Sequence, residues 1–213
     1  MTPPPDFDAA FRAKLEELFR WRRDVRQFKR DPVPPEILAG LLDLACLAPS
    51  VGYSQPWRFV SVEDAKNRAA VRENFLACNK DALADYRGER AKLYAGLKLS
   101  GLDDAPVHLA VFSDSESETG HGLGQKTMPE SKAYAVVMAI HTLWLAARAR
   151  EIGMGWVSIL DPAEIKRILA VPESWDFIAY LCIGYPQADS DQPELKRRGW
   201  EDIDPAAHKL LKR

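Results

Sequence analysis

Apolar positions in this 213-residue chain recur with helical spacing in some stretches and form short unbroken runs in others. Helical spacing, with proline and aspartate start signals, predicts helices over 8–22, 34–47, 64–78 and 162–169. Continuous apolar runs predict strands over 57–62, 107–112, 154–160 and 177–185. Helices therefore dominate, with about four strands, and we expect one domain over 1–213.

Four further stretches depart from these simple patterns. Residues 129–152 are apolar on more than one face, which predicts a long helix buried nearly all round, in a core or a subunit interface. Residues 113–128 are rich in glycine and serine and are expected to form a loop. Residues 79–100 look helical but more polar, and 186–213 are polar with no core of their own. Residues 1–7 are expected to be disordered.

Composition and charge exclude several classes of partner. The net charge is -2, so there is no general electrostatic case for nucleic acid or an anionic membrane. No apolar run approaches the roughly 20 residues of a membrane span, and the polar, proline-rich start does not read as a signal peptide, so we expect a cytoplasmic protein. The three cysteines are far apart and the histidines lack ligand spacing, which predicts buried thiols and no metal site.

The densest charge lies in WRRDVRQF, at the end of the first predicted helix. Arg22, Arg23 and Arg26 are either a solvated last turn that complements the helix dipole or a clamp for phosphate. Asp24, between them, is either their salt-bridge partner or a carboxylate held in a cationic site, where it could act as a base or orient a hydroxyl. Neither GxGxxG nor GxxxxGK[ST] is present, so no Rossmann or P-loop site is supported.

Two loops carry further candidate chemistry. APSVGYSQPWRF, residues 48–59, is a turn before a strand, yet its polar groups and Trp57 also suit a ligand-binding loop. GMGWVSI, residues 153–159, is either a tight turn or a strand whose backbone N–H groups face a flat ligand, with the Ser158 hydroxyl at the same place.

Taken in order, RRDVRQF, APSVGYSQPWRF, the long apolar helix, GMGW and LKRRGW resemble the FMN-dependent nitroreductase superfamily, over roughly 18–200. The resemblance implies an α+β fold with a mixed central sheet flanked by helices. It also implies an intertwined homodimer with two FMN sites at the interface. In this reading 186–213 wrap the partner subunit.

The resemblance also implies roles for individual residues. The arginines of the first motif would hold the FMN phosphate and ribityl chain, Arg198 (with Arg197 next) would also reach the phosphate, and Ser50 would lie along the flavin. The FMN-binding residues it implies are Arg22, Arg23, Asp24, Val25, Arg26, Ser50, Leu99, Ser158 and Arg198.

Two departures narrow the resemblance. Asp24 stands where ordinary nitroreductases read R-x-S-x-R, and Tyr53 stands where they usually carry Asn before QPW. With LKLSGL, GLGQKTMPES and GWVSIL, the pattern resembles one branch, the 5,6-dimethylbenzimidazole synthases. That branch uses reduced FMN as a substrate and O2 as co-substrate. It yields the lower ligand of vitamin B12 and a four-carbon sugar phosphate.

The branch implies that Asp24 and Ser158 are catalytic, with Asp24 moving protons near the ribityl chain and Ser158 bonding near flavin N5. Leu99 would contact the flavin, residues 79–100 would form a lid, and a separate flavin reductase would supply reduced FMN. Three alternatives stay open: an NAD(P)H-dependent nitroreductase or quinone reductase, a non-catalytic FMN carrier, and a helical interaction protein without flavin. Asp24 and Tyr53 argue against the first of these.

Overall fold

The computed structural model describes residues 3–97, 101–207 and 209–212. Its helices are α1 (Ala9–Trp21), α2 (Pro35–Ala45), the 3-10 turn η1 (Val51–Tyr53), α3 (Ala65–Ala84), α4 (Gly88–Ala95), α5 (Gly101–Asp104), α6 (Ser131–Arg148), α7 (Pro162–Leu169) and α8 (Glu194–Arg197). Its strands are β1 (Trp57–Ser61), β2 (Val107–Asp114), β3 (Gly153–Val157) and β4 (Trp175–Gly184). Leu99 lies outside the described residues.

The four strands form one sheet in the order β1-β2-β4-β3. All three strand pairs are antiparallel. Among the described residues, the expected mixed character is limited to one parallel bridge, between Asp24 and Met154 at the edge of β3. β1 and β3 therefore form opposite edges of the sheet, and this separation matters for the site.

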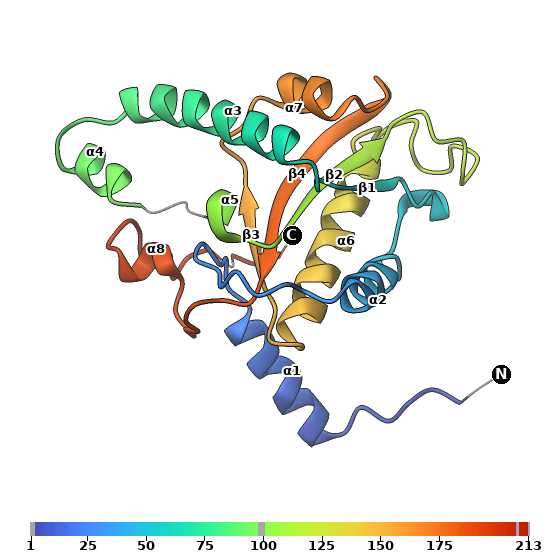
Figure 1. The fold of residues 1–213 in the computed structure, drawn as a ribbon. Coiled ribbons are helices and arrows are strands. Elements are labelled where there is room, and N and C mark those ends of the chain that lie inside the picture. The colour runs from blue at the N-terminus through green and yellow to red at the C-terminus, as the bar shows by residue number, and fades with distance from the viewer. Residues whose placement is uncertain (1–2, 98–100, 208, 213) are drawn as a thin grey trace.

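Helices cover both faces of the sheet, which confirms the α+β class (Figure 1). Alternate residues of β4 explain this arrangement, because successive side chains of a strand point to opposite faces. Leu181 and Ile183 join the core beneath α2 and α6, whereas Tyr180 and Cys182 join the core beneath α3 and α7. β4 reads as an unbroken apolar run because both of its faces are buried.

Aspartates begin three of the helices where the sequence places them. Asp8 accepts from the N–H of Phe11 at 2.7 Å, and Asp64 likewise caps α3. Asp161 caps α7 with two such bonds. The predicted helix over 64–78 runs on to Ala84, so the first part of the more polar stretch continues α3.

The long helix α6 is buried on one face within a single chain. Val136, Ile140 and Leu143 lie fully in the core, while Val137 and Met138 are exposed. The sequence predicts that this helix is buried nearly all round, but within a single chain only one of its faces is buried. In the part of the chain that the structure describes, no helix combines the length and apolarity that a membrane crossing requires.

Candidate functional site

The arginine-rich segment 22–26 lies alongside β3. The N–H of Val25 donates to the carbonyl of Met154 at 3.0 Å. This approach requires glycine, because a Cβ on Gly155 would lie 2.1 Å from the Val25 carbonyl oxygen, and one on Gly153 would lie 2.7 Å from a Val25 methyl group. The glycines of GMGW therefore do admit another backbone, and that backbone is the arginine-rich segment.

Asp24 is held by two donors from different parts of the chain. One carboxylate oxygen accepts from the backbone N–H of Trp156 at 3.0 Å, and the other accepts from Arg26 Nε at 3.1 Å. The Asp24 side chain is 37% exposed and that of Arg26 is 14% exposed. The carboxylate is thus oriented and charge-paired while one side of it stays open.

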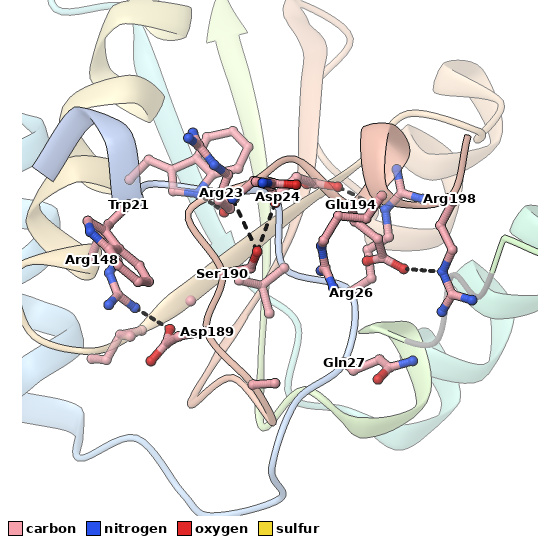
Figure 2. Close-up of a pocket in the computed structure, with 17 residues that line it drawn as sticks. Trp21, Arg23, Asp24, Arg26, Gln27, Arg148, Asp189, Ser190, Glu194 and Arg198 are labelled. Atoms are coloured by element: carbon pink, nitrogen blue, oxygen red, sulfur yellow. Dashed lines mark hydrogen bonds and ion pairs between the residues drawn. The ribbon is translucent and has the colours of Figure 1, made fainter. Parts of the chain in front are cut away.

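A cavity of about 140 Å³ lies beside this pair, and we call it the arginine cavity (Figure 2). Its charged lining residues are Arg23, Asp24, Arg26, Arg148, Asp189, Glu194, Arg197 and Arg198. Arginines outnumber carboxylates in this lining, so the cavity favours an anion. Burial, and then the neighbouring Arg22, lower the pKa of Arg23, as expected where cations are gathered.

A second cavity of about 110 Å³, the inner cavity, adjoins the first. Asp24, Val25 and Arg26 line both. The other lining residues of the inner cavity are mostly apolar or aromatic: Phe75, Gly101, Gly155, Trp156, Val157, Ser158, Ile159 and Cys182. A cationic compartment therefore opens next to a less polar one, with Asp24 at the junction.

Most of the residues predicted from the sequence come together here. Arg23, Asp24, Val25, Arg26 and Arg198 line the arginine cavity. Ser158 lines the inner cavity, but it lies one residue beyond the end of β3 and not on the strand as expected.

Two predicted residues lie elsewhere in a single chain. Arg22 places its guanidinium 4.9 Å from the ring centroid of Trp144 and lines neither cavity. Ser50 precedes η1, where its Oγ accepts from the N–H of Gln55 at 3.1 Å. Because η1 leads into β1, Ser50 lies at the sheet edge opposite Asp24.

Several residues of the site carry no clear signal in the sequence. Arg148, in the last turn of α6, pairs with Asp189 at 2.5 Å beside the arginine cavity. In the sequence, an arginine at this position looks like the basic residue that commonly ends a helix. Trp156 contributes a backbone N–H, which no side-chain pattern reveals. Cys182 lines the inner cavity as an inert thiol, because burial, and then the nearby Asp24 charge, raise its pKa to about 12.

Comparison with known proteins identifies the family of this chain. The model described as "Nitroreductase family" matches residues 19–185, which is most of the chain. The chain belongs to the nitroreductase family. Two curated relatives of this nitroreductase-family chain are named 5,6-dimethylbenzimidazole synthase. The one from Rhodospirillum rubrum is 54% identical over 100% of both chains. The one from Rhodobacter capsulatus is 47% identical over 92% of this chain and 95% of its own.

Solved structures agree on the fold. An iodotyrosine deiodinase, crystallised with FMN and 3-iodo-L-tyrosine, superposes with a TM-score of 0.71 at 25% identity. The match covers 93% of this nitroreductase-family chain and 97% of the deiodinase chain. A curated iodotyrosine deiodinase from Thermotoga neapolitana is 30% identical over 86% of this chain and 93% of its own. The synthases are thus nearer in sequence than the deiodinase relatives.

Proposed function

We propose that this protein is a 5,6-dimethylbenzimidazole synthase that takes reduced FMN as its substrate and O2 as co-substrate. The products would be 5,6-dimethylbenzimidazole and a four-carbon sugar phosphate. The observation that carries the proposal is the Asp24 carboxylate, which sits inside an arginine-rich segment at the junction of two cavities. Identity to two synthases over nearly the whole chain supports it.

The two cavities fit the chemical parts of FMN. The arginine cavity offers guanidinium groups from Arg23, Arg26 and Arg198, which suit a phosphate. The inner cavity offers apolar and aromatic walls, including Phe75 and Trp156, which suit a flat ring. A ribityl chain that joins the two would pass the junction of the cavities.

Asp24 is the group we assign to proton transfer. A carboxylate has about four acceptor positions, and the bonds from Trp156 and Arg26 use two of them. The remaining positions can accept from a ribityl hydroxyl or take its proton. Ser158 would place a hydroxyl, both donor and acceptor, against the ring portion in the inner cavity. Cys182 stays protonated there and does not act as a nucleophile.

The proposal includes a homodimer and an external source of reduced FMN. Ser50 lies at the far edge of its own sheet, so it would reach a flavin only in the site of a second subunit. We propose that residues 186–213 contact the partner subunit in addition to their own chain, and that a separate flavin reductase in the cytoplasm supplies the substrate. The chemistry assigned here calls for FMN and O2 and for no metal.

One incubation tests the proposal. Purified protein is mixed aerobically with chemically reduced FMN, and total flavin and 5,6-dimethylbenzimidazole are measured by chromatography. Loss of flavin with matching formation of 5,6-dimethylbenzimidazole is expected. Quantitative return of oxidised FMN would contradict the proposal. Turnover of NAD(P)H would then point to a nitroreductase, and binding without turnover would point to a carrier.

A further inference from the structure

The C-terminal arm, residues 186–202, links the arginine cavity to helix α4. Its first part is tied to the cavity wall. The Asp191 carbonyl accepts two bonds from the guanidinium of Arg23, at 3.0 and 2.6 Å. Asp189 pairs with Arg148, and α8 then brings Arg197 and Arg198 into the lining of the cavity (Figure 2).

The end of the same arm packs against α4 and the turn before it. The Trp200 ring meets Tyr86 edge-on at a centroid distance of 5.4 Å and lies 6.2 Å from the ring of Tyr94. Tyr86 and Tyr94 stack at 4.9 Å. Arg90 donates to the Trp200 carbonyl at 3.0 Å and holds its guanidinium 5.1 Å from the indole centroid.

This aromatic cluster is anchored to the body of the protein. The Tyr94 hydroxyl donates to the Asn79 side chain on α3 at 2.7 Å, and Tyr94 is buried. Ion pairs flank the cluster, with Arg90 to Glu201 at 3.5 Å and Lys196 to Asp202 at 2.7 Å. Surface ion pairs contribute little stability, so the aromatic packing is the main contact between the arm and α4.

One residue separates the cavity lining from the cluster. Gly199, with φ +71°, turns the chain between Arg198 and Trp200. The N–H of Trp200 then donates to the carbonyl of Leu195 at 2.9 Å, so the backbone that carries the indole is tied to α8. A displacement of α8 toward or away from the cavity would therefore carry the Trp200 backbone with it and disturb the contacts of the indole with Tyr86 and Tyr94.

We propose that Trp200 is a positioning residue that couples phosphate recognition by Arg197 and Arg198 to the position of α4. This inference rests on the proposed function, because it takes the anion in the arginine cavity to be the FMN phosphate. A phosphate would hold α8 at the cavity, and Trp200 would transmit this order to α4. A flavin without phosphate would fill the inner cavity yet leave α4 as it is in the free protein.

Amide hydrogen exchange of α4 tests this coupling with a readout other than turnover. Exchange of 88–95 is measured in the free protein, with oxidised FMN, and with riboflavin at matched occupancy determined by flavin fluorescence. We expect FMN to slow exchange in α4 at least fivefold and riboflavin to slow it less than twofold. In Trp200→Ala, FMN binding should weaken by less than tenfold, while the slowing of α4 by saturating FMN disappears.

Two variants control for general damage. Trp200→Phe keeps an aromatic edge for Tyr86 and should restore at least half of the FMN-dependent slowing in α4. Ile203→Ala removes an exposed side chain of the following segment and should behave as the wild type. Equal slowing by riboflavin and FMN in the wild type would overturn the coupling, as would full slowing by FMN in Trp200→Ala. Failure of the wild type to bind reduced FMN under anaerobic conditions would overturn the proposed function itself.

Discussion

At the scale of single residues, Asp24 is positioned by groups that lie far apart in the sequence. The Trp156 N–H comes from β3 and the Arg26 guanidinium comes from the same segment as Asp24. Asp24→Asn keeps the size of the side chain and an oxygen for Trp156, but it removes the negative charge and the basic site. We expect FMN affinity within about threefold of wild type and product formation reduced by at least a hundredfold, since proton transfer contributes on the order of 10²–10⁴.

Asp191→Asn is the matched control for Asp24→Asn. It removes a nearby carboxylate but keeps the Asp191 backbone carbonyl that Arg23 uses. Its product rate, measured with chemically reduced FMN under air, should stay within threefold of wild type. A normal product rate in Asp24→Asn would remove Asp24 from the chemistry and leave it a binding residue.

The close contact between Gly155 and Val25 leads to a second prediction at the scale of single residues. Gly155→Ala would place a Cβ 2.1 Å from the Val25 carbonyl, so the arginine-rich segment must move away from β3. Overpacking of this kind costs about 1–3 kcal/mol. Urea unfolding should show that loss, and FMN affinity should fall with it.

Gly40→Ala provides the contrast to Gly155→Ala. Gly40 lies inside α2, and nothing lies within 4 Å of the Cβ that alanine would add. Because glycine is unfavourable inside a helix, this change should stabilise the protein by about 0.5–1 kcal/mol. Equal unfolding free energies for the two variants would contradict the assigned role of Gly155.

Side-chain chemistry in the site could be predicted from the sequence more fully than its spatial arrangement. The clustered arginines leave a solvated helix end and an anion site both open, and the family resemblance favours the anion site; Arg23, Arg26 and Arg198 do line one cavity. The position of Ser50 could not be predicted, because it depends on the order of the strands in the sheet. Backbone donors such as the Trp156 N–H leave no trace in a residue pattern.

At the scale of elements, β2 and β4 are joined by a buried polar pair as well as by their ladder. His108 Nδ1 lies 2.9 Å from the Tyr180 hydroxyl, and both side chains are buried. Burial, and then the nearby Arg68 charge, lower the pKa of His108 to about 4. The imidazole is therefore neutral in the folded protein at neutral pH.

This pair predicts a pH dependence of stability. Because the folded pKa lies below the unfolded value of about 6.5, the unfolded chain takes up the proton first as the pH falls. The contribution of His108 is complete above about pH 6.5 and is lost toward pH 4, on the order of 3 kcal/mol. Urea unfolding between pH 7 and pH 4.5 measures this loss.

His108→Gln separates this effect from other titrations. The variant should be less stable at pH 7, because a buried partner of Tyr180 is changed. Its stability should fall less steeply than that of the wild type between pH 6.5 and pH 4.5. Parallel curves for the two proteins would assign the acid sensitivity to other groups.

Helices could be predicted from the sequence where apolar spacing and a capping residue together mark both of their ends. Periodic apolar positions and aspartate caps predict α1 and α7 to within a residue or two. The end of α3 was not predictable in this way, because polar residues beyond Cys78 continue the helix without apolar periodicity. The apolar run 154–160 predicts one strand, yet β3 ends at Val157, which is the last residue that pairs with β4.

At the scale of the whole molecule, one face of α6 carries apolar side chains outside the core of the single chain. Tyr134, Val137 and Met138 are 53%, 43% and 40% exposed. Contiguous exposed apolar groups of this kind are typical of subunit interfaces. A homodimer would bury them, as we expect from the apolar character of the helix.

Met138→Glu tests the dimer. Burying a carboxylate in an apolar interface is unfavourable, so the variant should sediment as a monomer at micromolar concentration, where the wild type sediments as a dimer. Leu76→Glu, an equally exposed change on α3, should leave the dimer intact. A wild-type protein that is monomeric at high micromolar concentration would remove the dimer from the proposal.

The backbone hydrogen bond from the Val25 N–H to the Met154 carbonyl has a consequence for solubility. An unpaired sheet edge offers N–H and carbonyl groups to the strands of other molecules, and β3 would form such an edge without the segment 22–26. The segment 22–26 bonds to that edge at Met154 and Trp156, so it would hinder strand pairing with other molecules as well as form a wall of the cavity. A substitution that changes ligand preference by moving this segment away from β3 would expose the edge of β3 to pairing with strands of other molecules. The substitutions that the segment 22–26 tolerates are therefore limited by solubility as well as by ligand binding.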